Sequence, residues 1–248
     1  MAQEYERYAV YWLPDAGDPL AAFGCRWTGW CAEAGARRER GAWEAFPEGV
    51  EGFTADLACH GLHAALWGAS RLHRDRTSFT FEHLLDAVAG KTRPIALPPF
   101  RLGILGGRVV LLPAREPPAL TRLVDELGRS LDALRAPERG TGGEGVRAAR
   151  PGTDSTADRF HLALTDPLSE AEARAFLPRI ADIVEPFLGG ERLVSEICLM
   201  GDPGGKRPLR VVERFPLAGG DEGDGGAILA ARGRDPRSGP LGGGPVPM

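Results

Sequence analysis

One order of elements occurs twice along the chain, and it limits the fold more than any other feature. In each half, a strand-like run with a histidine precedes a helical pattern and then two apolar runs joined by a glycine-rich turn. The two histidines, His63 and His161, lie 98 residues apart. A whole unit repeated at an interval is typical of internal duplication. The sequence predicts an α/β (α+β) fold with two lobes, in which two pseudo-twofold-related sheets carry outer helices and enclose a central cleft.

The first half is read from its hydrophobic pattern. The residues RYAVYWLP near the N-terminus predict a strand, because aromatic and β-branched side chains are enriched in strands. Residues 62–67 predict the first histidine strand, and apolar residues at helical spacing predict a helix from about Thr80. Two apolar runs then flank Gly106 and Gly107, which is a hairpin signal. The rest of this half is predicted as a helix over about 19–31 and a loop over 32–58.

The second half begins with a leucine stripe that predicts a helix from Pro118. The run RFHLALTD predicts the second histidine strand, and Ser169 with Glu172 forms a capping box that predicts the next helix. The runs RLVSEICLM and LRVVERFPL predict two further strands. Composition then divides the chain into an N-terminal lobe (1–115), a C-terminal lobe (116–217) with a flexible Gly-rich loop (137–158), and a disordered tail (218–248).

Charge and composition exclude several function classes. The net charge is −4, and no run of Lys and Arg is present to neutralise phosphates, so nucleic acid is not expected as a partner. No apolar run reaches the ~20 residues that span a bilayer, so the chain is predicted to be cytoplasmic without membrane contact. The four cysteines form no C-x-x-C pair, and no phosphate-binding glycine motif is present. We therefore expect no metal, no cofactor and a small-molecule partner, and the oligomeric state stays open.

The histidine strands are the main candidate site. Because alternate residues of a strand share a face, His63, Ala65 and Trp67 are predicted to point one way. By the same spacing, His161, Ala163 and Thr165 share a face in the second half. If both faces line the cleft, the two imidazoles can work as acid and base, since an unperturbed histidine has a pKa near ~6.5. Against this stands the common case of a histidine that only packs inside a strand.

Three further residues are candidates for substrate binding. Arg71 and Arg159 lie near the two histidine strands in sequence, and a guanidinium can hold a phosphate or carboxylate with two hydrogen bonds. More often such arginines are solvated surface residues. Tyr11 is predicted to line the cleft or to pack the sheet. His60 and His63 have the spacing of a metal-ligand pair, but on a strand they would point to opposite faces.

These stretches are similar to the two-histidine (2H) phosphoesterase superfamily, and within it to the branch found near phosphonate-metabolism genes. The resemblance rests on RYAVYWLP, GLHAAL, ALPPFRLGILGG, RFHLALT and LRVVERFPL, and covers most of residues 7–217 with gaps. It implies a bilobal fold and metal-independent chemistry on a phosphoester, often a cyclic one. One histidine would activate the nucleophile, the other would protonate the leaving oxygen, and a Thr or Ser two residues after each would hold the phosphoryl oxygens. Arg71 and Arg159 match basic positions of that branch.

Three positions depart from the pattern of the superfamily. Ala65 and Ala163 stand where the resemblance expects hydroxyls, and Trp67 stands where it expects a lysine. Loss of one oxyanion donor typically lowers the rate by ~10²- to 10³-fold. Thr165 lies about 6.6 Å further along its strand, too far for the same hydrogen bond.

Three functions therefore stay open. The first is a divergent enzyme whose histidines move protons on a less anionic, more apolar small molecule, by hydrolysis, isomerisation or cyclisation in a specialised or phosphonate-related pathway. The second is a phosphodiesterase for a cyclic or phosphonate-linked ester. The third is a noncatalytic binding protein with a vestigial site. The presence of both imidazoles favours the first.

Overall fold

The computed structural model describes residues 5–40, 46, 47, 49–137, 159–205 and 207–219. The predicted flexible loop (137–158) lies outside the described residues except for Pro137. The predicted tail (218–248) likewise lies outside them except for its first two residues.

The described residues form eleven strands and five α-helices, with short 3₁₀ turns between some of them. The strands are β1 (Arg7–Trp12), β2 (Trp30–Cys31), β3 (Ala36–Arg37), β4 (Ala64–Ser70), β5 (Ile95–Leu97), β6 (Phe100–Leu105), β7 (Arg108–Pro113), β8 (Leu162–Ala163), β9 (Arg192–Val194), β10 (Glu196–Asp202) and β11 (Arg210–Pro216). The helices are α1 (Pro19–Thr28), α2 (Val50–Phe53), α3 (Ser78–Lys91), α4 (Pro118–Leu131) and α5 (Glu170–Val184). Among the described residues, no helix combines the length and apolarity required to cross a membrane.

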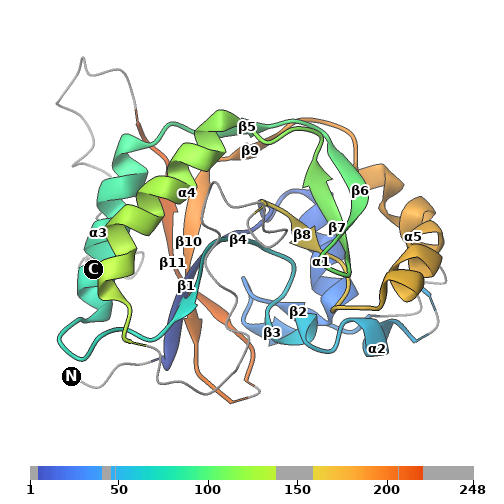
Figure 1. Cartoon of the computed structure of the whole chain (residues 1–248), viewed down its shortest axis with the longest axis horizontal. Coiled ribbons are helices and arrows are strands. Elements are labelled where there is room, and N and C mark those ends of the chain that lie inside the picture. Colours follow the sequence, from blue (N-terminus) through green and yellow to red (C-terminus); the bar gives the residue numbers. More distant parts are fainter. Residues whose placement is uncertain (1–4, 41–45, 48, 138–158, 206, 220–248) are drawn as a thin grey trace, which may run out of the picture.

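Two antiparallel sheets organise the molecule, and each takes strands from both halves of the chain (Figure 1). The first has the order β11-β10-β1-β4, so the strand after His63 lies in one sheet with the β10–β11 hairpin of the second half. The second has the order β6-β7-β8, so the strand after His161 pairs with the hairpin of the first half. The predicted division into contiguous lobes at residue 115 therefore does not describe the sheets, because the two halves exchange their hairpins.

Helices cover one face of each sheet. Helix α3 packs against β10, β11 and α4, while α4 also packs against β4 (Figure 1). Helix α5 packs against β6 and β7 of the other sheet. The opposite face of the first sheet carries a smaller apolar cluster that includes Tyr11, Trp30 and Ala32. The α/β (α+β) architecture with several antiparallel sheets and outer helices is thus present.

Local sequence signals explain where several elements begin and end. Gly106 and Gly107 both have positive φ, at 56° and 75°, and join β6 to β7 as a two-residue hairpin requires. The predicted capping box at Ser169 and Glu172 is confirmed at the start of α5. The second histidine strand is shorter than predicted, because only Leu162 and Ala163 pair with β7. The predicted loop over 32–58 was only partly right, since β3, α2 and the first residues of a 3₁₀ turn lie within it.

Candidate active site

The segment before His63 is held by the segment after His161. The 3₁₀ turn Leu57–Cys59 leads into His60, and its first amides need acceptors. The buried carboxylate of Asp166 accepts hydrogen bonds from the Asp56 and Leu57 amides at 2.8 and 3.0 Å. In return, the Asp166 amide donates to the Phe53 carbonyl at 2.6 Å. These three bonds join the two histidine segments directly.

His63 is held by the backbone turn just before it. Gly61 has φ of 74°, which turns its carbonyl back so that His63 Nδ1 lies 2.9 Å from it. A carbonyl only accepts, so the neutral ring carries its proton on Nδ1 and leaves the Nε2 lone pair available. The Gly61 Cα lies against Ala32 and Trp30, where an added Cβ would meet atoms of both at 3.5 Å.

His161 repeats the same arrangement in the second half. Its Nδ1 lies 2.7 Å from the carbonyl of Arg159, again two residues earlier in the chain. The neutral ring therefore has the same tautomer as His63, with Nε2 as the acceptor. Both histidines are half-buried. Two imidazole bases with matching orientation devices thus occur at corresponding places of the two halves.

Burial and neighbouring groups lower the pKa values of both histidines. Burial, the neighbouring His60 and the charges of His161 and Arg108 together lower the pKa of His63 to about 3. Burial and Arg108 also lower the pKa of His161. Both rings are therefore neutral near pH 7 while the site is empty. A negatively charged ligand between them would raise both pKa values, because it would offset the charge of Arg108.

The rings of Tyr11 and His60 both lie close to that of His63. The Tyr11 ring stacks on His63 with centroids 4.0 Å apart and an interplanar angle of 17°. The His60 ring centroid lies 6.0 Å from that of His63, and His60 Nδ1 lies 2.9 Å from the Asp56 carbonyl. The prediction that His60 and His63 point to opposite faces was wrong, because the residues between them form a turn and not a strand.

The two alanines lie where the sequence placed them, but Thr165 does not. Ala65 is half-buried opposite Tyr11 on β1, and Ala163 is half-buried opposite Val110 on β7. Thr165 is fully buried, and its hydroxyl accepts a hydrogen bond from the Val109 amide at 3.0 Å. The expected exposure of Thr165 to a substrate was wrong. Its hydroxyl accepts the hydrogen bond of a β7 amide, as a backbone carbonyl of a neighbouring strand would do.

Trp67 points away from His63. Val10 pairs with Trp67 and Tyr11 pairs with Ala65, so β4 has one extra residue at Leu66. This β-bulge turns Trp67 onto the helix-covered face, because an extra residue reverses the alternation that follows it. There its indole donates to Asp132 at 3.0 Å and packs on Phe81. The predicted shared face of His63 and Trp67 was therefore wrong.

The two arginines predicted from sequence have different positions. Arg71 follows the far end of β4, roughly 20 Å of strand from His63, and pairs with Glu6. Its predicted place beside the first histidine was wrong, because β4 carries it away. Arg159 is exposed and supplies its carbonyl to His161. The structure thus stacks Tyr11 on His63 and pairs Ala65 with Tyr11, while Ala163 pairs with Val110 in the other sheet.

Sequence reasoning missed Arg108. This half-buried residue begins β7, and its guanidinium donates to the Thr165 carbonyl at 3.2 Å. Its charge acts on both His63 and His161. The sequence contains a signal for it. Arg108 directly follows the Gly106–Gly107 turn and lies two positions before Val110, so the two side chains point to the same side of the strand. Without the pairing of β7 with β8, that signal does not show which histidine lies beside it.

A family match covers more than half of the chain. Residues 70–150 and 157–210 match the family described as "Protein of unknown function (DUF1045)". The chain belongs to this family. No curated protein matches it.

Solved structures resemble this DUF1045 member at low identity. E. coli LigT complexed with 3'-AMP is 16% identical over 86% of this chain and 99% of its own, with a TM-score of 0.43. The protein TT0787 of Thermus thermophilus is 18% identical over 86% of this chain and 98% of its own, with a TM-score of 0.46. A structure titled as a phosphoesterase is 16% identical, over 86% and 99% of the two chains, with a TM-score of 0.44. Likeness at this level does not assign a function.

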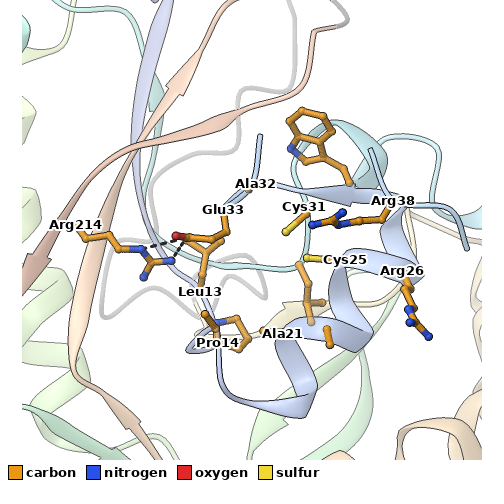
Figure 2. A pocket seen from close by; sticks show the side chains of 14 residues that line it. Leu13, Pro14, Ala21, Cys25, Arg26, Cys31, Ala32, Glu33, Arg38 and Arg214 are labelled. Carbon is orange, nitrogen blue, oxygen red and sulfur yellow. Dashed lines mark hydrogen bonds and ion pairs between the residues drawn. The ribbon is translucent and has the colours of Figure 1, made fainter. Parts of the chain in front are cut away.

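This family member also has a pocket of about 390 Å³ beside the histidine site (Figure 2). Its walls include Leu62, which precedes His63, and Trp30, which contacts Gly61, but neither His63 nor His161 lines it. Cys25 and Cys31 both line it, and burial raises the pKa of Cys25 to about 12. Within the described ranges, no three His, Cys, Asp or Glu side chains are grouped to hold a metal ion.

Proposed function

We propose that this chain is a divergent 2H phosphoesterase-like enzyme that uses His63 and His161 as a metal-independent acid–base pair on a small molecule. The observation that carries the proposal is the matched pair of imidazoles, each with its Nδ1 proton on the carbonyl two residues earlier and its Nε2 free to exchange a proton. A histidine that only packs in a strand has no need of a second copy held by the same backbone contact.

The two rings divide the proton transfers in a hydrolysis. His63 Nε2 removes a proton from water as the water oxygen forms a bond to the phosphorus or carbonyl centre. The bond to the leaving oxygen breaks, and that oxygen takes a proton from Nε2 of the protonated His161. The two rings then exchange their protonation states with solvent, which restores the starting enzyme. In this scheme His63 acts as the base and His161 acts as the acid.

A phosphodiester is the substrate class that the site favours over a more apolar ester. A more apolar substrate was expected for two reasons, the methyl groups of Ala65 and Ala163 in place of hydroxyls and an indole in place of a cationic side chain. The second reason fails, because Trp67 lies in the core instead. A cationic group is present from another strand, since Arg108 acts on both imidazoles. An anionic substrate would also raise the lowered pKa of His161, which favours the protonated form that the acid needs.

The test is hydrolysis of simple cyclic phosphodiesters, followed by ³¹P NMR at high enzyme concentration. Acid and base catalysis each contribute about 10²- to 10⁴-fold, so His63→Gln and His161→Gln should each lower turnover by that factor. His83→Gln is the matched control, because His83 is exposed on α3. Absence of turnover in the unmodified chain would contradict the phosphodiester substrate. Unchanged turnover in both site variants would contradict the acid–base pair.

A further inference from the structure

Two arginines share one face of the β6-β7-β8 sheet with His161. In this antiparallel sheet, Leu111 of β7 pairs with Leu102 of β6 and with Leu162 of β8. At the next position along β7, Leu112 pairs with Arg101 of β6. Paired residues point to the same side, as do residues two apart on one strand. Arg101 and Arg108 therefore lie on the side that carries Val110 and Ala163. The alternation of β8 places His161 there as well.

A small apolar cluster lies on this face between the two arginines, with small residues at its centre. Gly103 and Ala163 are the partners on either side of the buried Val110, and neither has a side chain larger than a methyl group. A Cβ placed on Gly103 would lie 3.3 Å from Cδ1 of Leu112 and 3.4 Å from Nη1 of Arg101. The guanidinium of Arg101 therefore lies over Gly103. It extends along β6 toward Leu105, the residue that pairs with Arg108.

No described residue pairs its charge with either of these arginines. No ion pair to Arg101 or Arg108 occurs among the residues that the structure describes, and the recorded partner of Arg108 is the neutral Thr165 carbonyl. Arg101 is exposed and Arg108 is half-buried, so ligand can reach the first and is partly desolvated at the second. Two forked cations with open donors on one face of a sheet are suited to a tetrahedral oxyanion.

We infer that Arg101 and Arg108 form an anion clamp over Gly103 and Ala163, which binds the phosphoryl oxygens of the substrate beside His161. The clamp rests on the proposed function, and it names the group that the site recognises. It replaces the donors that the hydroxyls of the 2H pattern would supply, because Arg108 lies diagonally across from Ala163 on the neighbouring strand, where side chains can reach one another.

The experiment is titration of the full chain with inorganic phosphate, followed by calorimetry and by the His161 ring signals in NMR spectra. We expect Arg108→Gln to weaken phosphate binding by about tenfold or more, since it removes a charge-assisted hydrogen bond. Arg101→Gln should have a smaller effect, and the double variant should abolish binding. Arg122→Gln, exposed on α4, is the control and should bind as the unmodified chain does.

Two further variants distinguish the clamp from a general charge effect and from a folding defect. Arg108→Lys keeps the charge but loses the forked geometry, so we expect it to bind phosphate more weakly than the unmodified chain and more tightly than Arg108→Gln. Acetate should compete poorly with phosphate. Unchanged phosphate affinity in the double variant, or phosphate binding that leaves the His161 signals unmoved, would overturn the inference.

The outcome also separates the clamp from the acid–base pair. His63→Gln should keep phosphate affinity while it loses turnover. If His63→Gln keeps full turnover and Arg108→Gln still loses phosphate, the acid–base proposal is wrong and the clamp stands. If His63→Gln loses turnover but the arginine variants bind phosphate normally, the acid–base pair stands and the clamp is wrong.

Discussion

The two histidine segments are built alike but surrounded differently. Each ring gives its Nδ1 proton to the carbonyl two residues before it. His63 in addition lies under the Tyr11 ring and beside His60, and both His161 and Arg108 act on it. Arg108 is the charge that acts on His161. The carbonyl contact therefore fixes the tautomer at both sites, whereas the neighbouring groups set the pKa of each ring.

Under the proposed function, His63 is the base and His161 is the acid. A general base works best with a pKa near the working pH, so a bound anion has to raise the pKa of His63 from about 3. The acid must hold a proton once substrate is bound, and the same anion would offset the charge of Arg108 that lowers the pKa of His161. Equal environments would leave the direction of proton flow undetermined.

The largest expected effect comes from breaking the link between the two segments. Asp166→Ala removes the acceptor of two backbone amides before His60, and each such bond to a charged group contributes about 1.5–3 kcal/mol. We expect a loss of about 3 kcal/mol in the free energy of unfolding, measured by urea denaturation. Turnover should fall by up to about 10²-fold through misplacement of His63.

Asp182→Ala, at an exposed position of α5, is the control for Asp166 and should leave both quantities unchanged. Asp166→Asn keeps one acceptor and should fall between the two. An Asp166→Ala protein of normal stability would show that the 3₁₀ turn does not depend on this carboxylate.

The second effect is acid destabilisation through the buried rings. In the unfolded chain a histidine titrates near ~6.5, while folding lowers the pKa of His63 to about 3. Below pH ~6.5 the unfolded state therefore binds more protons than the folded state, and stability falls as the pH drops toward 3. His63→Gln should flatten this fall more than His161→Gln, as measured by urea denaturation at several pH values. Equal slopes in the two variants would contradict the difference between the rings.

A smaller effect separates the two carbonyl contacts. Gly61 has positive φ, so Gly61→Ala should lower the free energy of unfolding by about 1 kcal/mol and displace the His63 carbonyl partner. Arg159→Ala leaves the carbonyl of its position in place, so turnover should change little. Thermal denaturation and turnover of both variants provide the measurement. A larger loss of turnover in Arg159→Ala than in Gly61→Ala would mean that the Arg159 side chain itself binds substrate.

The smallest effect concerns the third imidazole. His60 lowers the pKa of His63 and does not contribute to that of His161, whereas Arg108 lowers both. His60→Asn should therefore raise the pKa of His63 alone, and Arg108→Gln should raise both, as followed by NMR titration of the ring protons. A shift of His161 in His60→Asn would show that the two sites are more tightly coupled than their contacts indicate.

Local patterns predicted the elements better than their pairing. The capping box at Ser169 and the turn at Gly106–Gly107 act within a few residues, so the sequence was sufficient to place them. The exchange of hairpins between the halves depends on contacts between segments far apart in the chain, and no local pattern encodes it. The bulge at Leu66 depends on the partner strand β1, which is why the alternation rule failed for Trp67.

The sequence alone determined the chemical equipment of the molecule: two histidines at corresponding places of a repeated unit, with alanines two residues after each. It did so because residue type and repeat spacing are properties of the chain itself. Tertiary structure decided which groups surround those rings, by bringing Arg108 from one hairpin and Asp166 from the far end of a strand, and by turning Trp67 and Thr165 inward. Side-chain direction and local electric field depend on strand register and burial, and these exist only once distant segments have packed together.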